Sequence, residues 1–413
     1  MKRRSLLLGS AGFGAAGALW SPGGVAVPAT GAGHDSYFAA MNAMLKAKGP
    51  GRPAMLIDLQ RMNHNIDALS ASVGKHKTYR VVVKSLPSVP LLEHIMKRAN
   101  TNALMVFHQP FLNVIAQEFP QADVLLGKPM PVSAVRTFYA KLKPGRFDPA
   151  RQIQWLVDSH ERLLQYQSLA RELGVKLRIN FEIDVGLHRG GWVDPHDLNA
   201  ALKVIAADAK HLSVAGLMGY EPQLTGMQAT LEHATVKEVL SIYRSFIARL
   251  RAAGLDMASM TLNGAGSHTL KIYEGDDTMN DLSAGSGVIM PTDFDTFHLT
   301  AHQPAAFIAT PILKRYEGNP FVAEPPDAMA RLYYIYGGFW KAKIASPAQV
   351  GDTIYESTNQ SPITTSLDVD LAVDDYMFFR PTQSEFVLLQ FGDLLVFDEN
   401  QLTAIWPVFQ QTG

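Results

Sequence analysis

A lysine stands where an apolar strand is expected to end. In TYRVVVKSLPS, residues 78–88, the run Val81–Val83 is followed directly by Lys84. Lysine is common where strands reach the surface, so this position alone is compatible with an ordinary solvated side chain. A lysine at the end of a buried strand is also suited to nucleophilic chemistry, because partial desolvation lowers the pKa of an amine and leaves more of it neutral. The neighbouring motifs have to decide between the two interpretations.

Ionisable residues are concentrated in FEIDVGLHRGG, residues 181–191. Glu182 and Asp184 alternate along an expected strand, so both are expected to face the same side. Carboxylates inside a barrel need partners, and Arg189 is the obvious partner for these two. His188, beside that arginine, is a candidate acid or base, or alternatively a residue that caps the loop.

Two later turns are rich in glycine and serine: NGAGSHT, residues 263–269, and SAGSG, residues 283–287. In barrels of parallel strands, the turns after the seventh and eighth strands hold phosphate, because backbone N–H groups converge there on an anion. Glycines also form simple tight turns, so each motif alone is weak, whereas both together favour phosphate. The residues predicted to bind it are Gly264, Gly266, Ser267, Gly285, Ser286 and Gly287. Tyr220, which ends GLMGYEP, is a candidate to contact a bound ring or substrate, or to be a packed aromatic.

The elements that would position these residues are short apolar strands alternating with amphipathic helices. Eight strands alternating with helices are typical of a (β/α)8 barrel, although a doubly wound open sheet would also fit the alternation. The clearest helix carries apolar residues at i, i+3 and i+4 from Val239 and closes at Gly254. The expected strands are Tyr79–Lys84, Ala103–His108, Asp123–Gly127, Ile153–Asp158, Lys176–Asp184, Leu212–Tyr220, Met260–Asn263 and Asp281–Ile289.

The sequence becomes rich in β signals after residue 300. RLYYIYGGFW, SLDVDLAV and EFVLLQFGDLLVFDENQLTAIWPVF all fit strands, and the last predicts a hairpin that turns at residues 398–400. We therefore expect a barrel over residues 50–295 and a C-terminal β domain over residues 300–413. The early strand AMLID, residues 54–58, lies before the barrel and is a candidate to join the β domain.

Composition limits the classes of function. The chain has 413 residues, 47% of them hydrophobic, which is enough for more than one domain. A formal net charge of −1 gives no excess of basic residues for binding phosphate backbones, so nucleic acid is not an expected partner. The sequence contains no cysteine, which excludes disulfides, thiolate metal sites and a cysteine nucleophile.

The first 33 residues have the features of an export signal. Lys2, Arg3 and Arg4 precede a short stretch rich in glycine and alanine. This pattern predicts a twin-arginine signal peptide and a periplasmic protein without a membrane anchor after signal removal. A transmembrane anchor is the alternative, but the apolar run is short and rich in glycine.

A lysine at a strand end and a phosphate pocket at the same barrel mouth suggest pyridoxal phosphate. This cofactor needs a lysine for a Schiff base, donors for its phosphate and a group that tunes its ring. The sequence therefore predicts that Lys84 is the Schiff-base lysine of an enzyme whose substrate is an amino acid.

Several segments also carry a family resemblance, which covers most of the chain from about residue 50. RPAMLIDLQRMNHNI resembles the opening of alanine-racemase-type barrels, and RVVVK is similar to the cofactor-binding R-P-H-V-K segment of D-threonine aldolases and D-serine dehydratases. DVLLGKPM and WLVDSHERL resemble the third and fourth strands of that branch. EIDVGLHRGG is similar to E-x-D-V-G-x-x-R-x-G, whose arginine, here Arg189, approaches the cofactor ring. NGAGSHT and SAGSG resemble its phosphate-binding segments.

The chain departs from this family pattern at informative positions. Val82 and Gly287 stand where the family has a histidine and a tyrosine. The resemblance also implies a C-terminal P-x-H-x-[CD] metal pair, but RPTQSE places Gln383 and Glu385 there. Glutamate binds hard cations through oxygen, whereas glutamine is a poor substitute for histidine. The sequence therefore predicts no zinc site, and it leaves open whether these two residues bind another divalent metal.

The resemblance favours a lyase that acts on D-β-hydroxy amino acids, like D-threonine aldolases and D-serine dehydratases. An amino-acid racemase of the alanine racemase type is the alternative; it needs an acid or base on each face of the α-carbon, and Lys84 supplies one. Racemases of this fold draw the other from a partner subunit, so a homodimer is expected under either function. A non-catalytic protein that binds pyridoxal phosphate or amino acids is the third hypothesis.

Overall fold

The computed structural model describes residues 32–318, 330–348, 350 and 353–410. The predicted signal peptide falls mainly on residues 1–31, which lie outside the described residues. No helix in the described ranges combines the length and the apolar character needed to cross a bilayer.

Eight parallel strands form a closed barrel, which confirms the predicted (β/α)8 architecture over the open-sheet alternative. The barrel closes where β2 pairs with β9, with Thr78 opposite Asp281 and Val81 opposite Ala284. Its strands are β2 (Thr78–Val82), β3 (Ala103–Val106), β4 (Asp123–Leu126), β5 (Ile153–Val157), β6 (Leu177–Ile183), β7 (Leu212–Gly219), β8 (Thr261–Gly264) and β9 (Asp281–Ala284).

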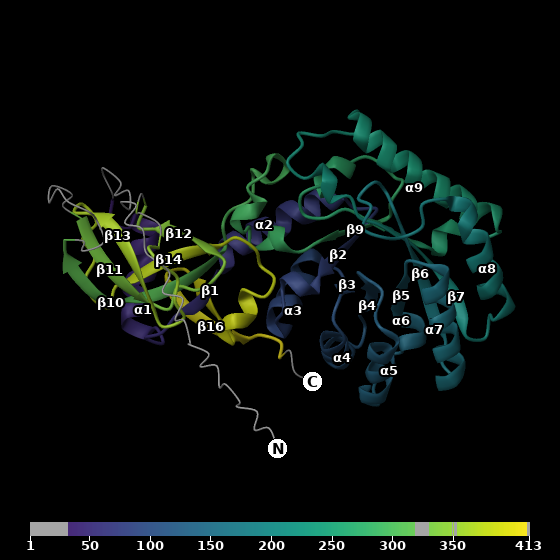
Figure 1. The fold of residues 1–413 in the computed structure, drawn as a ribbon, viewed down its shortest axis with the longest axis horizontal. Helices are drawn as coiled ribbons and strands as arrows, with labels where there is room; N and C mark the ends of the chain where they lie inside the picture. The colour runs from purple at the N-terminus through teal and green to yellow at the C-terminus, as the bar shows by residue number, and fades with distance from the viewer. Residues whose placement is uncertain (1–31, 319–329, 349, 351–352, 411–413) are drawn as a thin grey trace, which may run out of the picture.

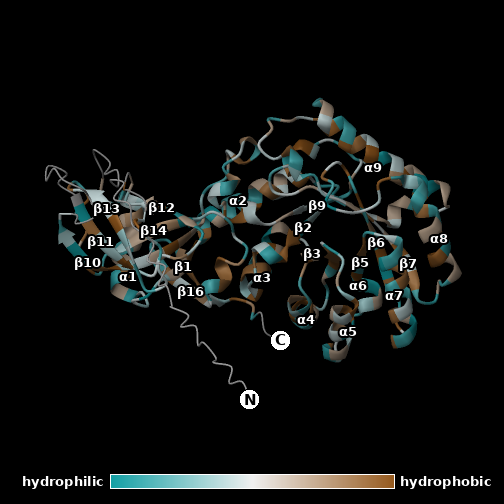
Figure 2. Cartoon of the chain, viewed as in Figure 1, coloured by the Kyte–Doolittle hydropathy of each residue, from teal (hydrophilic) through white to brown (hydrophobic). Residues whose placement is uncertain are grey.

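Helices surround the barrel, and all of them except the short α6 bury apolar residues against it. α9 covers the apolar positions predicted from Val239 onward, and hydrophobic and hydrophilic residues alternate along it in Figure 2. It ends beside Gly254, whose φ of +80° is the left-handed conformation that glycine adopts easily. The barrel helices are α2 (Leu59–Val73), α3 (Val89–Ala99), α4 (Gln109–Glu118), α5 (Val132–Lys141), α6 (Pro149–Gln152), α7 (His160–Leu173), α8 (Leu198–Ala207) and α9 (Ala234–Ala252).

Most barrel strands end one or more residues earlier than the sequence predicted, and the ends of β2 and β9 matter for the site. β2 stops at Val82, and Lys84 lies in the 3-10 turn Val83–Ser85 instead of in the strand. β9 stops at Ala284, because the backbone of Gly285 leaves the extended conformation and Ser286–Val288 forms another 3-10 turn. The chain therefore bends at both places, at the mouth of the barrel.

A second, eight-stranded sheet lies beside the barrel, on the left in Figure 1. β1, the AMLID strand, pairs antiparallel with β10 and parallel with β15 inside this sheet. The order along the main path is β12-β14-β10-β1-β15-β16, and β11 pairs with both β10 and β13. The strands are β1 (Ala54–Asp58), β10 (Ala306–Glu317), β11 (Ala330–Tyr336), β12 (Ala342–Ser346), β13 (Gln360–Ser366), β14 (Tyr376–Pro381), β15 (Asp393–Asp398) and β16 (Gln401–Pro407).

The sheet is buried on both faces around β1. Met55 and Ile57 join the large core shared with the barrel, whereas Leu56 packs with α1 (Ser36–Lys48) on the opposite face. The predicted hairpin forms between β15 and β16, where Glu399 and Asn400 make a two-residue turn with positive φ at both positions.

A buried asparagine joins the first barrel helix to the connection between the two parts of the chain. Asn65 on α2 is fully buried, and its amide donates to the carbonyls of Val288 at 2.9 Å and Gln303 at 2.7 Å. Its Oδ1 accepts the backbone N–H of Gln303 at 2.8 Å. Because every polar group of this side chain is paired, α2 is fixed relative to the turn after β9.

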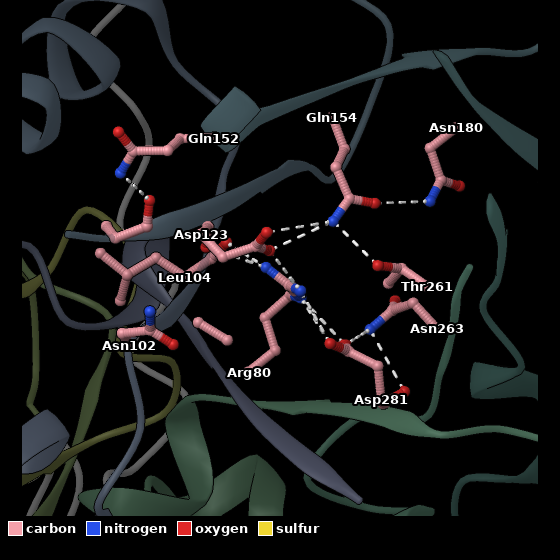
Figure 3. Close-up of polar contacts among 12 residues, drawn as sticks. Arg80, Asn102, Leu104, Asp123, Gln152, Gln154, Asn180, Thr261, Asn263 and Asp281 are labelled. Carbon is pink, nitrogen blue, oxygen red and sulfur yellow. Dashed lines mark hydrogen bonds and ion pairs between the residues drawn. The ribbon is translucent and has the colours of Figure 1, made fainter. Parts of the chain in front are cut away.

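The interior of the barrel contains a buried ion network, drawn in Figure 3. Arg80 on β2 is 2% exposed, and its guanidinium contacts Asp281 on β9 at 2.7 Å and Asp123 on β4 at 2.8 Å. Amide side chains complete the network: Asn263 donates to Asp281 at 2.5 Å, and Gln154 donates to Asp123 at 3.1 Å. Arg80 thereby connects β2 to its neighbour β9 and to β4, the second strand on its other side.

Replacement of this arginine should destabilise the whole barrel. We expect Arg80→Met to lower the free energy of unfolding by about 3–5 kcal/mol, because it leaves the buried carboxylate of Asp281 without its cation. Urea denaturation followed by circular dichroism measures the change. Arg98→Met is the matched control, because Arg98 pairs with Asp67 at 2.6 Å on the exposed surface. Solvent screens such a pair, so the control should lose less than about 1 kcal/mol. Equal losses in both variants would contradict a special role for the buried network.

Candidate active site

A hollow opens at the carboxyl ends of the barrel strands. Its inner part has a volume of about 400 Å³ and its outer part about 570 Å³. The two parts share a wall formed by Lys84, Phe107, Gly127, Arg189 and Glu385. The inner part also brings together most of the residues singled out in the sequence, which are Tyr220, Gly266, Ser267, Gly285 and Ser286. Residues far apart in the chain therefore face one space.

Lys84 reaches this hollow from the 3-10 turn after β2. Its Nζ lies 2.6 Å from Oε1 of Glu385, and it lies 4.7 Å from the centroid of the Phe107 ring. The side chain is 39% exposed, so it is accessible from the cavity. The structure thus places the amine at the mouth of the barrel, between a carboxylate and an aromatic face, where a small molecule in the hollow can reach it.

The two glycine-rich turns meet at one serine. The hydroxyl oxygen of Ser267 accepts the backbone N–H groups of Gly285 at 3.2 Å and Gly287 at 3.0 Å. Two N–H groups that point at one position create a site that favours a hydrogen-bond acceptor. A phosphate oxygen is such an acceptor. The same hydroxyl keeps its own hydrogen as a further donor.

The turns also approach their neighbours so closely that a side chain would not fit. A Cβ atom on Gly266 would lie 3.0 Å from the ring of Tyr220, and one on Gly285 would lie 2.8 Å from Cβ of Val82. Ser286, predicted as a phosphate donor, bonds instead to Ser85 at 3.1 Å and Ser384 at 2.6 Å. Gly264 ends β8, where an added Cβ would meet the sulfur of Met279. The hydroxyl hydrogen of Ser267, on the wall of the inner hollow, therefore fits a phosphate oxygen as its acceptor.

Arg189 lies over the ring of Tyr220, with 5.1 Å between the guanidinium carbon and the ring centroid. Both residues line the inner hollow, as predicted for groups near a cofactor ring. Glu182 lines the outer part; burial raises its pKa, and the charge of Arg189 opposes that shift. The inner hollow thus combines a cation, a phenol ring and a strand-end lysine.

The structure does not bring His188 into the hollow. Its side chain is 82% exposed, and its Nδ1 pairs with Oδ2 of Asp184 at 2.8 Å. Asp184 also accepts the backbone N–H groups of Gly186 at 2.9 Å and His188 at 3.0 Å. Burial acts to raise the pKa of Asp184, but these hydrogen bonds outweigh it and the pKa is lowered. Asp184 therefore organises its own loop instead of pairing with Arg189, and His188 caps that loop.

The segment matched to a metal pair makes contacts within the chain. Gln383 donates to Oδ2 of Asp293 at 2.6 Å, and Glu385 pairs with Lys84. Within the described ranges no group of three or more histidine, aspartate or glutamate side chains is arranged to hold a metal ion. The absence of a zinc site stays a prediction of the sequence.

Some residues of the site were missed by sequence reasoning. Phe107 faces Lys84 from the turn after β3, and the ring of His268 stacks on Phe294 with 4.1 Å between centroids. Burial lowers the pKa of His268. His268 lies inside the glycine-rich NGAGSHT motif, so the sequence contained a signal for it. Nothing in the sequence indicated that Phe294 would stack on its ring.

Glu221 is the most important of the missed residues. It directly follows Tyr220, is 1% exposed, and accepts a hydrogen bond of 2.6 Å from Thr269. The same threonine hydroxyl accepts the backbone N–H of Gly266 at 3.0 Å. Burial raises the pKa of Glu221 to about 7. This carboxyl group therefore supports the first glycine-rich turn from behind the hollow.

The raised pKa of Glu221 makes stability depend on pH. The folded chain keeps a proton on this carboxyl that the unfolded chain releases near its ordinary pKa of 4.5. The resulting stability is fully present below pH 4.5 and is lost as the pH rises through about 7. Glu221→Gln removes this titration. We expect the free energy of unfolding of the wild type to fall relative to that of the variant, by up to about 3 kcal/mol, across this range.

Urea denaturation at a series of pH values measures this difference. Glu161→Gln is the matched control, because Glu161 is an exposed glutamate on α7, and its curve should follow that of the wild type. Parallel curves for wild type and Glu221→Gln from pH 4.5 to 7 would show that Glu221 does not titrate as described.

Comparisons with known proteins add to this geometry. A family model described as alanine racemase, N-terminal domain, matches residues 57–290. The chain is similar to the solved structure of a D-threonine aldolase from Filomicrobium marinum, with 18% identity, 86% of this chain and 94% of that chain covered, and a TM-score of 0.70. It is also similar to a D-threo-3-hydroxyaspartate dehydratase from Delftia sp. HT23 (16% identity, 88% and 98% covered, TM-score 0.69). A third similar structure is an alanine racemase of Clostridium difficile 630 (15% identity, 86% and 98% covered, TM-score 0.65). No curated protein sequence matches the chain.

Proposed function

Because the chain belongs to the alanine racemase N-terminal domain family, whose members are fold-type III pyridoxal-phosphate enzymes, we propose that it is a pyridoxal-phosphate-dependent lyase acting on D-β-hydroxy amino acids. The observation that carries this proposal is the meeting of Lys84 and both glycine-rich turns in one hollow. An amine and a phosphate site that line one hollow suit that cofactor.

Some residues of the hollow would bind the cofactor, and others would transfer protons. Pyridoxal phosphate, when bound, withdraws electrons from the α-carbon of an attached amino acid and weakens the bonds to that carbon. The hydroxyl of Ser267, whose oxygen accepts the N–H groups of Gly285 and Gly287, would donate to the phosphate. Lys84 would anchor the cofactor and would move protons at the substrate. Arg189 lies over the ring of Tyr220 and would contribute its positive charge beside a bound cofactor.

The choice of a lyase rests on the resemblance of the motifs and on two of the similar solved structures, a D-threonine aldolase and a D-threo-3-hydroxyaspartate dehydratase. An amino-acid racemase is the alternative, since alanine racemases share the fold. Racemisation requires an acid or base on the face of the α-carbon opposite Lys84. Glu385 contacts the amine of Lys84 itself, so it lies on the same side as Lys84 and does not supply the opposite face.

We also propose export to the periplasm by the twin-arginine route and assembly as a homodimer. Export is supported by the pattern that begins with Lys2, Arg3 and Arg4. The dimer is supported by the family, in which a partner subunit contributes to the site. A folded protein that already carries its cofactor is the cargo for which this route is suited.

The visible absorption spectrum tests the cofactor proposal. We expect purified wild-type protein incubated with pyridoxal phosphate to show a visible band that borohydride bleaches, and we expect Lys84→Ala to lack it. Lys128→Ala is the matched control, because Lys128 lines the outer hollow and should leave the band in place. A wild type that stays colourless after incubation would remove the basis of the proposal.

A substrate screen then separates the lyase from the racemase. We expect cleavage or elimination with D-β-hydroxy amino acids and little reaction with the L-enantiomers, measured by the aldehyde or keto-acid product with and without Mn²⁺. Interconversion of D- and L-amino acids on a chiral column, without such products, would favour the racemase.

Replacement of Arg189 separates an enzyme from a non-catalytic binder. We expect Arg189→Ala to keep the visible band but to lose turnover by about 10²-fold or more, because a positioned charge beside the reacting group is removed. Arg162→Ala is the matched control, because Arg162 also lies over a tyrosine, Tyr166 at 5.8 Å, on helix α7 outside the hollow. No turnover by the wild type on any amino acid, with the cofactor bound, would favour the binder.

A further inference from the structure

The chain returns from the β domain to the barrel directly after β16. The N–H of Val408 still donates within the β domain, to the carbonyl of Gly392 at 3.1 Å. The next N–H, that of Phe409, donates instead to the carbonyl of Pro87 at 2.7 Å. Pro87 lies three residues after Lys84, in the segment that we call the lysine turn, residues 83–88. The end of the β domain is therefore bonded to the turn that carries the candidate Schiff-base lysine.

The side chain of Phe409 makes a second contact with the barrel. It is 6% exposed, and its ring meets the ring of Phe111 edge to face, with 4.7 Å between centroids. Phe111 lies in the first turn of α4 and lines the outer part of the hollow. Its ring also meets that of His108, the residue before the helix, at 5.0 Å. Phe409 therefore packs on a residue that forms part of the wall of the hollow.

Both contacts lead to the surroundings of Lys84. The start of α4 follows Phe107, whose ring centroid lies 4.7 Å from the Nζ of Lys84. The lysine turn is also bonded within the barrel, where the hydroxyl of Ser286 donates to that of Ser85 at 3.1 Å. The backbone of Phe409 thus holds the segment that carries the amine, and its ring holds the segment that faces the amine.

The lysine turn is too short to be stable by itself. Val83–Ser85 forms a 3-10 turn that is closed by the bond from the N–H of Leu86 to the carbonyl of Val83 at 3.0 Å. A 3-10 turn of this length gains little from its own hydrogen bonds, because fixing the backbone costs more than one bond returns. The position of Lys84 therefore depends on contacts that the neighbouring residues make with the rest of the chain.

We propose that Phe409 is a positioning residue for Lys84. This inference rests on the proposed function, because a lysine that bonds to a cofactor held at a phosphate site has to lie at a fixed place relative to that site. Phe409 does not line either part of the hollow, so it acts through the lysine turn and through Phe111. The β domain thereby takes part in building the cofactor site from outside the hollow.

The β domain is attached to the barrel mouth at a second, separate place. Ser384, which is fully buried, forms a hydrogen bond of 2.6 Å with Ser286 in the second glycine-rich turn. This contact does not involve Phe409. Replacement of Phe409 should therefore loosen the lysine side of the hollow and leave the phosphate side in place.

Hydrogen exchange of the cofactor-free protein, followed by mass spectrometry, tests whether Phe409 holds the lysine turn. We expect Phe409→Ala to speed exchange in residues 83–88 and at the start of α4 by about tenfold, because local opening no longer breaks the aromatic contact. Residues 285–289 should exchange as in the wild type. Phe38→Ala is the matched control, because Phe38 is also buried in the β domain, at 8% exposed, but packs on the opposite face of the sheet.

The affinity for pyridoxal phosphate tests whether this contact positions Lys84. Titration of the visible band should give Phe409→Ala a Kd about tenfold higher than that of the wild type, because a small displacement of a reacting group is costly. Phe38→Ala should keep the wild-type Kd. Circular dichroism establishes which variants are folded. If Phe409→Ala does not fold, Phe409→Leu keeps more of the apolar volume and should shift both measurements in the same direction.

The outcomes distinguish the role of Phe409 from the proposed function. If the wild type forms no visible band, the proposed function fails, and hydrogen exchange still decides whether Phe409 holds the lysine turn. If the band forms, a folded Phe409 variant with wild-type exchange in the lysine turn, or with a wild-type Kd, overturns the positioning role while the proposed function stands. Equal changes in Phe409→Ala and Phe38→Ala would also overturn it, because they would reflect a general loss of stability.

Discussion

The barrel depends on one buried cation. Arg80 joins β2 to β9 and β4 through Asp281 and Asp123, in an interior where an unpaired charge would be very costly. Because β2 and β9 are the first and last strands of the barrel, this contact lies at the place where the wall closes. The network therefore connects these three strands by polar contacts in addition to apolar packing. It also fixes the strand that carries Lys84 to the mouth a few residues later.

The candidate site is built where two parts of the chain meet. The barrel supplies the lysine, the glycine-rich turns and Arg189, whereas the β domain supplies Glu385 through a segment anchored at Ser384. The phosphate side is supported from outside the hollow by Glu221 and Thr269, which form hydrogen bonds toward the first turn. The first glycine-rich turn and the segment of Glu385 are thus each held by residues outside the hollow. Such support limits the movement of side chains that have to act together.

Sequence reasoning predicted much of the fold and part of the site. Local patterns predicted the alternation of strands and helices, because periodicity, composition and turn chemistry are local properties. Local motifs also singled out Lys84, Arg189, Tyr220 and the glycine-rich turns as candidate site residues. The predicted strand through Ile289 was too long, since the apolar residues after Ala284 line a turn instead of extending a strand. His188 was expected near Arg189 because the two are adjacent in sequence. The loop conformation sends their side chains to different surroundings, with His188 on Asp184 and Arg189 on Tyr220.

The sequence by itself determined the types of residue available for chemistry and their order along the barrel strands. Because all carboxyl ends of parallel strands meet at one edge, that order already implied that Lys84 and the later turns would share a site. Only the tertiary structure decided which side chains touch. The pairing of Lys84 with Glu385 joins residues about 300 positions apart, and the burial of Glu221 depends on packing from several elements. Contacts and burial of this kind are set by the three-dimensional arrangement of the whole chain, so no local pattern contains them.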